Sequence, residues 1–163
     1  MSVKARYVPT LFERMAGHDH FEGREAIRLL TAEEVKESVA RDLESLLNCR
    51  CALDEDVFKN YPEALRSMCS YGMSDFVGMS LANPADRNRI CRSLERTIAT
   101  HEKRLSEVRA SLELEEGSTN RLRFVINALL VLHPTAEPVF FDALLQPSTL
   151  QYSVSRSRRT AAM

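Results

Sequence analysis

The chain has 163 residues and a formal net charge of −1, with charged residues making up 28% of the total. This length suits one domain with a single core. The near-neutral balance disfavours a nucleic-acid partner, because phosphate binding needs a surplus of cations. The longest apolar run, 124–132, is too short to span a bilayer, so we expect a cytoplasmic protein without a membrane-inserted segment.

The first 30 residues show only weak periodicity. Val8, Leu11, Phe12 and Met15 predict one or two amphipathic turns, and a glycine- and histidine-containing stretch follows them. Such a segment is typical of an arm that docks on something outside the core. We therefore expect residues 1–30 to form an N-terminal docking arm, with a loosely attached terminus as the alternative.

Two helices are predicted by their capping residues. Thr31 and Glu34 form a capping box, and the apolar stripe that follows predicts a helix to about Asn48. Asn83 is a good N-cap and Pro84 suits the first helical position of a second helix. The stretch between them is predicted to be a polar, turn-rich connection over 54–60, a short helix over 62–71 stopped by Gly72, and irregular structure.

After His101 the hydrophobic period changes from that of a helix to that of a strand. Alternation predicts strands over about 104–114, 121–132, 139–145 and 152–154, with a turn at 115–118 and a loop at 133–138. We expect an α+β fold with N-terminal helices packed on a mostly antiparallel three- to four-stranded C-terminal sheet. The domain is expected to span 31–154, and 155–163 to be a disordered basic tail.

Glu102 and Arg104 lie where the period changes from helix to strand. Charged residues at such a junction can pair with each other, cap neighbouring backbone groups or face a partner. We predict that both are partner-binding residues, because charged loop residues on a rigid scaffold often carry function. The alternative is a surface ion pair that stabilises by only about 0–1 kcal/mol.

The cysteines and histidines do not predict a metal site. Cys49 and Cys51 are spaced too closely for a structural zinc site, and neither Cys69 nor Cys91 supplies a second pair at ligand spacing. A His18-x-His20 pair could complete such a site only in principle, and buried free thiols beside surface histidines are the simpler interpretation. With no glycine-rich phosphate loop either, we expect no metal and no cofactor.

Several segments together resemble one family. The stretch 38–50 resembles its first helix, 71–76 its Tyr-Gly-Leu-Pro-Asp-Phe segment, and 102–105 its Glu-Pro-Arg-Leu motif. Residues 138–142 resemble its Pro-Val-x-Phe-Asp ending. The family is that of the baseplate wedge proteins of contractile machines: TssE of the type VI secretion system and its phage counterpart. Lys103 stands where the motif has proline, which frees the backbone at that position.

The resemblance implies a structural role in assembly. It implies that the domain joins the baseplate wedge to the first ring of the contractile sheath and seeds sheath polymerisation, within a complex docked at the inner membrane. The implied partners are the sheath proteins TssB and TssC and the wedge proteins TssF and TssG. The implied mechanism is strand addition, in which an exposed sheet edge accepts an extended segment of a sheath subunit.

Two alternatives remain open at this stage. One is a phage-type baseplate wedge protein; the other is a lysozyme-like peptidoglycan hydrolase, since phage members of the family have carried that label. Hydrolysis needs two carboxylates beside a cleft, and Asp75 or Asp142 would have to join Glu102. An arginine beside Glu102 would keep that carboxylate ionised instead, so we expect no catalytic residues and no enzyme.

Overall fold

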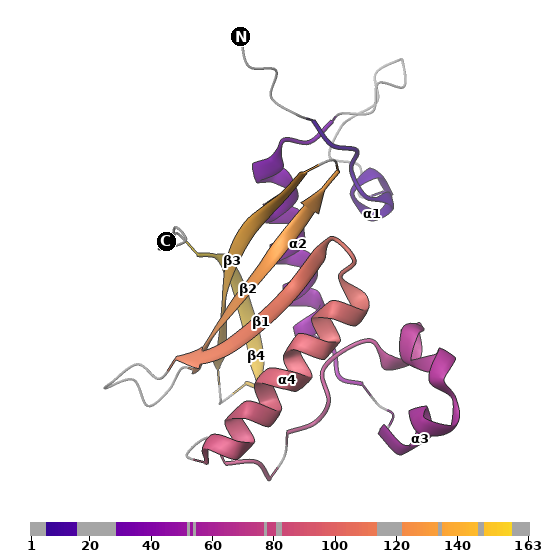
Figure 1. Ribbon diagram of the computed structural model, residues 1–163, viewed down its shortest axis with the longest axis vertical. Coiled ribbons are helices and arrows are strands. Elements are labelled where there is room, and N and C mark those ends of the chain that lie inside the picture. The colour runs from indigo at the N-terminus through magenta and orange to yellow at the C-terminus, as the bar shows by residue number, and fades with distance from the viewer. Residues whose placement is uncertain are drawn as a thin grey trace.

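The computed structural model of the chain describes residues 6–15, 29–51, 53, 55–76, 78–80, 83–113, 122–133, 135–146 and 149–157. The helices come first: α1 (Leu11–Met15), α2 (Ala32–Asn48), α3 (Glu55–Asn60), the short 3₁₀ helices η1 (Pro62–Arg66) and η2 (Met68–Ser70), and α4 (Pro84–His101). The strands β1 (Leu105–Glu113), β2 (Leu122–Leu132), β3 (Thr135–Gln146) and β4 (Gln151–Arg156) follow (Figure 1). This order confirms the predicted α+β class.

Both capped helices form where the sequence predicts them. The Thr31 N–H donates to the Glu34 carboxylate at 2.7 Å and the Glu34 N–H donates to the Thr31 hydroxyl at 3.3 Å, so the capping box that begins α2 is complete. The Asn83 side chain accepts from the Ala85 N–H at 2.9 Å at the start of α4. Local hydrogen bonds therefore set where each long helix begins.

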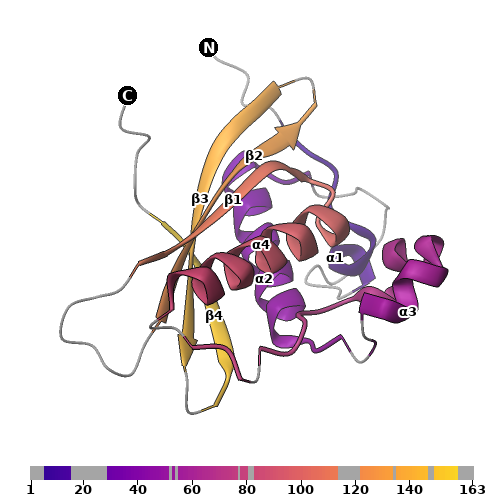
Figure 2. The same ribbon diagram turned by 60° about the horizontal axis from the view of Figure 1, so that its bottom comes forward.

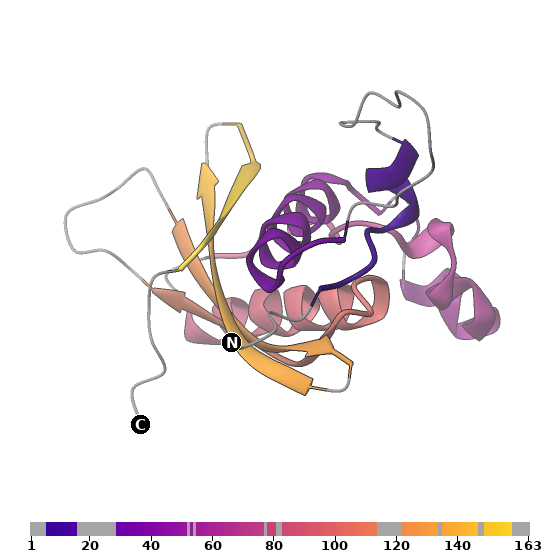
Figure 3. The ribbon, with the colours of Figure 1, turned by 90° about the horizontal axis from the view of Figure 1, so that it is seen from above.

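The four strands form one antiparallel sheet in the order β1-β2-β3-β4. α2 packs against β4 and α4 packs against β1, and the sheet curves round the two helices (Figure 3). The core lies between them. Its largest fully buried side chains include Leu43 and Leu47 of α2, Leu94 and Ile98 of α4, and Phe124, Ile126, Leu130 and Phe141 of the sheet.

Three short helices between α2 and α4, namely α3, η1 and η2, form a separate lobe. α3, η1 and η2 lie beyond α4, away from the sheet (Figures 1 and 2). The prediction of a turn-rich connection over 54–60 is wrong, because α3 begins at Glu55. The predicted helix over 62–71 is instead two 3₁₀ turns.

Gly72 follows the lobe and is held by a close backbone contact. Its φ is +113°, a conformation that side chains with a Cβ rarely adopt, and a Cβ there would lie 2.8 Å from the Cys49 carbonyl. The neighbouring Met73 N–H donates to the same carbonyl at 2.9 Å. Glycine thus lets this segment join the end of α2, in agreement with the stop predicted at this position.

Two of the strands are longer than predicted. β3 begins at Thr135, so the loop expected over 133–138 is mostly strand, and Pro138 pairs with Leu129. β4 reaches no further than the partner of Phe141, so within the described residues no strand lies on the outward side of β3 at Pro138. A proline therefore costs no ladder hydrogen bond there. β4 itself runs to Arg156, two residues into the segment expected to be a tail; residues 158–163 lie outside the described part.

β1 contains a bulge that the alternating pattern does not predict. The register with β2 shifts between Ser106 and Arg109, and Glu107 has a φ of 53°. Leu105 and Val108 are consequently both buried, although they are three residues apart. The bulge restores the apolar face of the strand to the core after the turn from α4.

Side chains of the helices cover the outer edges of the sheet. On β1, the Ala110 N–H donates to the Glu95 carboxylate at 2.8 Å, and the Leu112 backbone hydrogen-bonds the Cys91 thiol. On β4, the Tyr152 N–H donates to Asn48 at 2.8 Å, and the Asn48 amide donates back to the Tyr152 carbonyl at 2.9 Å.

One more edge group of β4 is covered in the same way, since the Val154 N–H donates to Glu44 of α2 at 2.7 Å. The expectation of a vacant edge is therefore wrong over these positions of β1 and β4. An incoming strand would have to replace helix side chains there, which protects the free protein against edge-to-edge association.

We predict that Glu44→Ala weakens this cover without unfolding the domain. Loss of a hydrogen bond to a charged group, about 1.5 kcal/mol, should speed amide exchange of Val154 roughly tenfold. Hydrogen exchange followed by NMR measures this. Glu37→Ala, an exposed glutamate of the same helix, is the matched control and should leave that amide unchanged. If the Val154 amide exchanges at the same rate in both variants, Glu44 does not protect the edge.

Candidate functional site

The predicted junction residues lie where α4 turns into β1. Glu102 is the C-cap of α4, with its N–H donating to the Ile98 carbonyl at 2.8 Å. The Leu105 N–H donates back to the Glu102 carbonyl at 3.2 Å, and the Arg104 carbonyl accepts from the Val131 N–H of β2 at 2.8 Å. Backbone hydrogen bonds thus fix the turn on both sides.

Glu102 and Arg104 form a bidentate ion pair with a buried carboxylate. Glu102 is only 7% exposed. Its Oε1 accepts from the backbone N–H of Arg104 at 3.0 Å and from Nε at 2.9 Å, and its Oε2 accepts from Nη2 at 2.5 Å. The alternative of a surface ion pair is therefore wrong, because a buried carboxylate of this kind depends on its cation.

Arg104 also reaches the first long helix. Its Nη1 donates to the Ser38 hydroxyl at 3.1 Å, and its Nη2 donates to Asp42. Burial lowers the pKa of Arg104, but hydrogen bonds and charge from Glu102 and Asp42 outweigh burial and raise it above its usual value. The guanidinium stays charged and ties the junction to α2.

Part of the N-terminal arm lies over this network. Tyr7 and Leu30 exchange backbone hydrogen bonds of 2.8 and 2.7 Å. The arm, α2 and the end of β2 enclose a hollow of about 400 Å³ lined by Glu13, Ser38 and Arg104, among others. Arg104 is therefore a lining group of this hollow, with its side chain 24% exposed.

Glu13 of α1 joins the same network. Burial raises its pKa, yet hydrogen bonds from Ser38 and Thr10, together with the charge of Arg104, keep the pKa below its usual value. The Arg41 guanidinium lies 3.6 Å from the Glu13 carboxylate. The arm is thus held at the junction by charge and hydrogen bonds as well as by apolar contact.

Glu102 and Arg104 were predicted from the sequence, but Ser38, Asp42 and Glu13 were not. Ser38 and Asp42 are one helical turn apart on α2, so they share a face. Ser38 is only 2% exposed, and it is the one polar residue in an otherwise apolar stripe. This polar residue in an apolar stripe was the available signal of a buried hydrogen bond, although spacing alone does not say which residue Ser38 bonds.

The arrangement does not supply the chemistry of a hydrolase. Both Glu102 oxygens accept hydrogen bonds from Arg104, and Asp142 instead pairs with Arg123 of β2 at 2.9 Å. Asp75 is exposed on the segment after the lobe. Glycoside hydrolysis needs two carboxylates beside a cleft, and both oxygens of Glu102 are already engaged by Arg104.

The described residues contain no group of three or more His, Cys, Asp or Glu side chains placed to hold a metal ion. His18 and His20 lie outside the described part. Of the thiols expected to be buried, only Cys91 is buried; Cys49 and Cys69 are exposed. Within the described ranges, no helix has both the length and the apolar character to cross a membrane.

The described helices and sheet, joined at a buried charged junction, form an α+β fold. Residues 33–135 match the sequence profile of the family described as baseplate wedge protein gp25, which includes the type VI baseplate wedge protein TssE. That match covers more than half of the chain, and the chain belongs to this family of structural baseplate proteins. No curated protein matched the chain in sequence comparison.

We predict that acid weakens the attachment of the arm through Glu13. Its lowered pKa means that it stabilises the fold fully above its unfolded value of 4.5 and that this contribution is lost as the pH falls through the folded value. The melting temperature of Glu13→Gln should therefore lie below that of the unmodified protein at neutral pH. The gap should close on acidification below 4.5, and a gap independent of pH would contradict this role.

Proposed function

We propose that this protein is the TssE-type subunit of a type VI secretion baseplate, and that it joins the wedge to the first ring of the contractile sheath. The observation that carries the proposal is the family match over 33–135, which includes the Glu102–Arg104 pair. In this role the protein seeds sheath polymerisation from TssB and TssC and is held in the wedge by TssF and TssG. It acts by binding, without catalysis, at the cytoplasmic side of the inner membrane.

Glu102 and Arg104 have different parts in this proposal. Glu102 is buried, so it acts by fixing the guanidinium. Arg104 lines the hollow beside the arm and meets the partner there, with its exposed edge and with Asp42, whose side chain is 54% exposed. Charged groups fixed in this way give orientation and specificity more than raw affinity.

The edge of β4 is the better acceptor for a sheath strand. α4 lies along β1, where its Glu95 accepts from the Ala110 N–H and its Cys91 thiol hydrogen-bonds the Leu112 backbone. On β4, the helix cover ends at the Val154 N–H. Within the described part of the chain, the Val154 carbonyl and the outward backbone groups of Arg156 make no hydrogen bond. A strand that begins pairing there can extend by replacing Glu44 and then Asn48.

The arm supports the proposed contact with TssF and TssG. Val8, Leu11 and Met15 are 67%, 64% and 71% exposed on it. Three large, exposed apolar side chains on one short segment are suited to binding the surface of another protein. In this proposal the arm binds the wedge proteins, and the β4 edge, a different surface, binds the sheath proteins.

The test is Val154→Pro, made in the full chain. Proline removes the outward N–H and places its ring on the edge, but the neighbouring residues keep their pairing with β3, so the fold should survive. We expect normal circular dichroism, loss of co-purifying sheath proteins and retained wedge proteins. Pull-down from cells carrying the complete secretion system measures this.

Val154→Ala is the matched control, because it shortens the same side chain but keeps the N–H. It should bind sheath proteins normally. Sheath assembly by the proline variant would refute strand addition at β4. Failure of the unmodified protein to co-purify with any wedge or sheath protein of the secretion system would refute the proposed function itself, and recovery with phage components would favour the phage-type alternative.

A further inference from the structure

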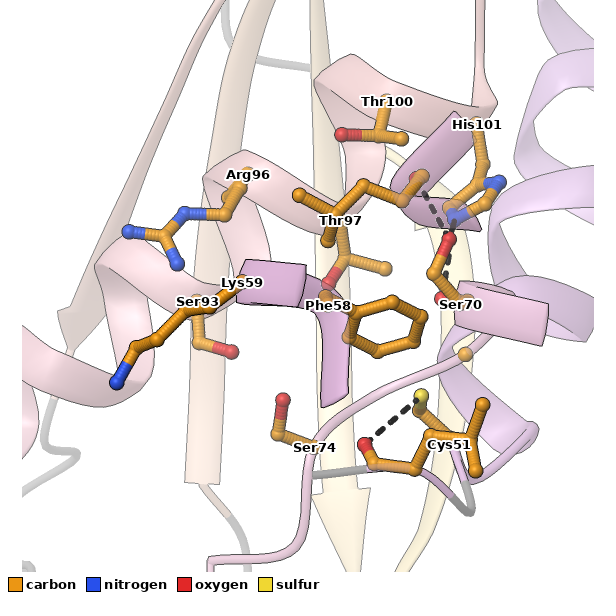
Figure 4. A pocket seen from close by; sticks show the side chains of 13 residues that line it. Cys51, Phe58, Lys59, Ser70, Ser74, Ser93, Arg96, Thr97, Thr100 and His101 are labelled. Carbon is orange, nitrogen blue, oxygen red and sulfur yellow. Dashed lines mark hydrogen bonds between the residues drawn. The ribbon is translucent and has the colours of Figure 1, made fainter. Parts of the chain in front are cut away.

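A second hollow lies on the opposite side of α4 from the core. It has a volume of about 280 Å³ and lies between α4 and the α3–η2 lobe (Figure 4). Leu53, Phe58 and Leu65 form its apolar wall. Ser93 and Thr97 line it from α4, so small side chains on the helix leave room opposite the larger ones of the lobe.

Both charged side chains of Lys or Arg type in the described lining of this hollow are cations. Its described lining includes the cations Lys59 and Arg96 and no carboxylate. Lys59 is paired with Asp56 of its own helix. Arg89 lies one turn before Ser93 on α4, and therefore extends the same face as a further cation.

Two arginines of α4 are available to an incoming group. Arg89 and Arg92 are both exposed, and neither forms an ion pair with a carboxylate within the described ranges. The acids of the same helix are engaged elsewhere: Asp86 accepts from the Ser80 N–H at 3.0 Å, and Glu95 accepts from the Ala110 N–H. The outer face of α4 is thus positive beside an apolar hollow.

The lobe adds exposed apolar surface around the hollow. Leu65, a lining residue, is 43% exposed, and Tyr61 and Met68 of the same lobe are 67% and 79% exposed. Large exposed apolar side chains gathered on one small lobe mark an interaction surface. The apolar wall and the positive rim together favour an occupant that has both apolar and acidic side chains.

We propose that this groove binds an acidic amphipathic segment of a partner protein. An apolar side chain of the segment enters the hollow against Leu53 and Leu65, and its carboxylates pair with Arg89 and Arg92. Guanidinium groups bind carboxylates through paired hydrogen bonds, which suits such a segment. Phe58 is only 5% exposed, so it offers no platform on which a nucleic-acid base could stack.

The site is separate from both the Arg104 hollow and the β4 edge. It therefore does not rest on the proposed function, and a variant here should leave sheath capture at β4 intact. The distinction matters for the test, because the two surfaces can be altered independently in the same full-length chain.

The experiment titrates the ¹⁵N-labelled full chain with a synthetic helical peptide that carries leucines on one face and glutamates on the other. We expect saturable shifts of the Ser93, Thr97 and Thr100 amides, with affinity that falls as salt is raised. Arg89→Glu combined with Arg92→Glu should weaken binding by about tenfold, since two attractions become repulsions.

The matched control combines Arg6→Glu with Arg109→Glu, which changes the net charge equally at exposed positions away from the groove. It should bind the peptide as the unmodified chain does. The proposal is overturned if the peptide does not bind, if its shifts map to another surface, or if both double variants lose affinity equally. Equal binding of a peptide with lysine in place of glutamate would also overturn it.

Discussion

The structure depends on one guanidinium. Arg104 follows α4 directly in the sequence, yet it hydrogen-bonds Ser38 and Asp42 of a helix more than 60 residues earlier. The same group neutralises the buried carboxylate of Glu102. A buried carboxylate without its cation is strongly destabilising, so the end of α4, the start of β1 and the middle of α2 hold one another in place.

That constraint has a consequence for the sheet. With α4 and α2 fixed to the junction, their polar side chains reach the outermost strands, Glu95 on β1 and Glu44 on β4. The helices therefore support the core with their apolar faces and close the sheet edges with their polar ones. A partner strand must therefore displace these side chains, and not only water, from the edge backbone groups. Pairing then favours a partner that also makes contacts elsewhere on the surface.

Local signals were sufficient to predict the capped helices, because Thr31, Glu34 and Asn83 act within a few residues of themselves. The start of β3 was missed because Pro138 is acceptable only where no strand lies outside it, a fact of topology. Glu102 and Arg104 were found from the change of period. The hydrogen bond from Arg104 to Ser38 and the electrostatic effect of Arg104 on Glu13 were not predicted, since nothing in the order of residues brings the arm, α2 and the junction together.

Arg104 should bind α2 to the junction energetically as well as geometrically. A double-mutant cycle with Ser38→Ala and Arg104→Met, measured by urea unfolding, tests it most directly. We expect both single variants to be destabilised, with a coupling free energy of about 1 kcal/mol or more. Additive effects, with a coupling near zero, would contradict it.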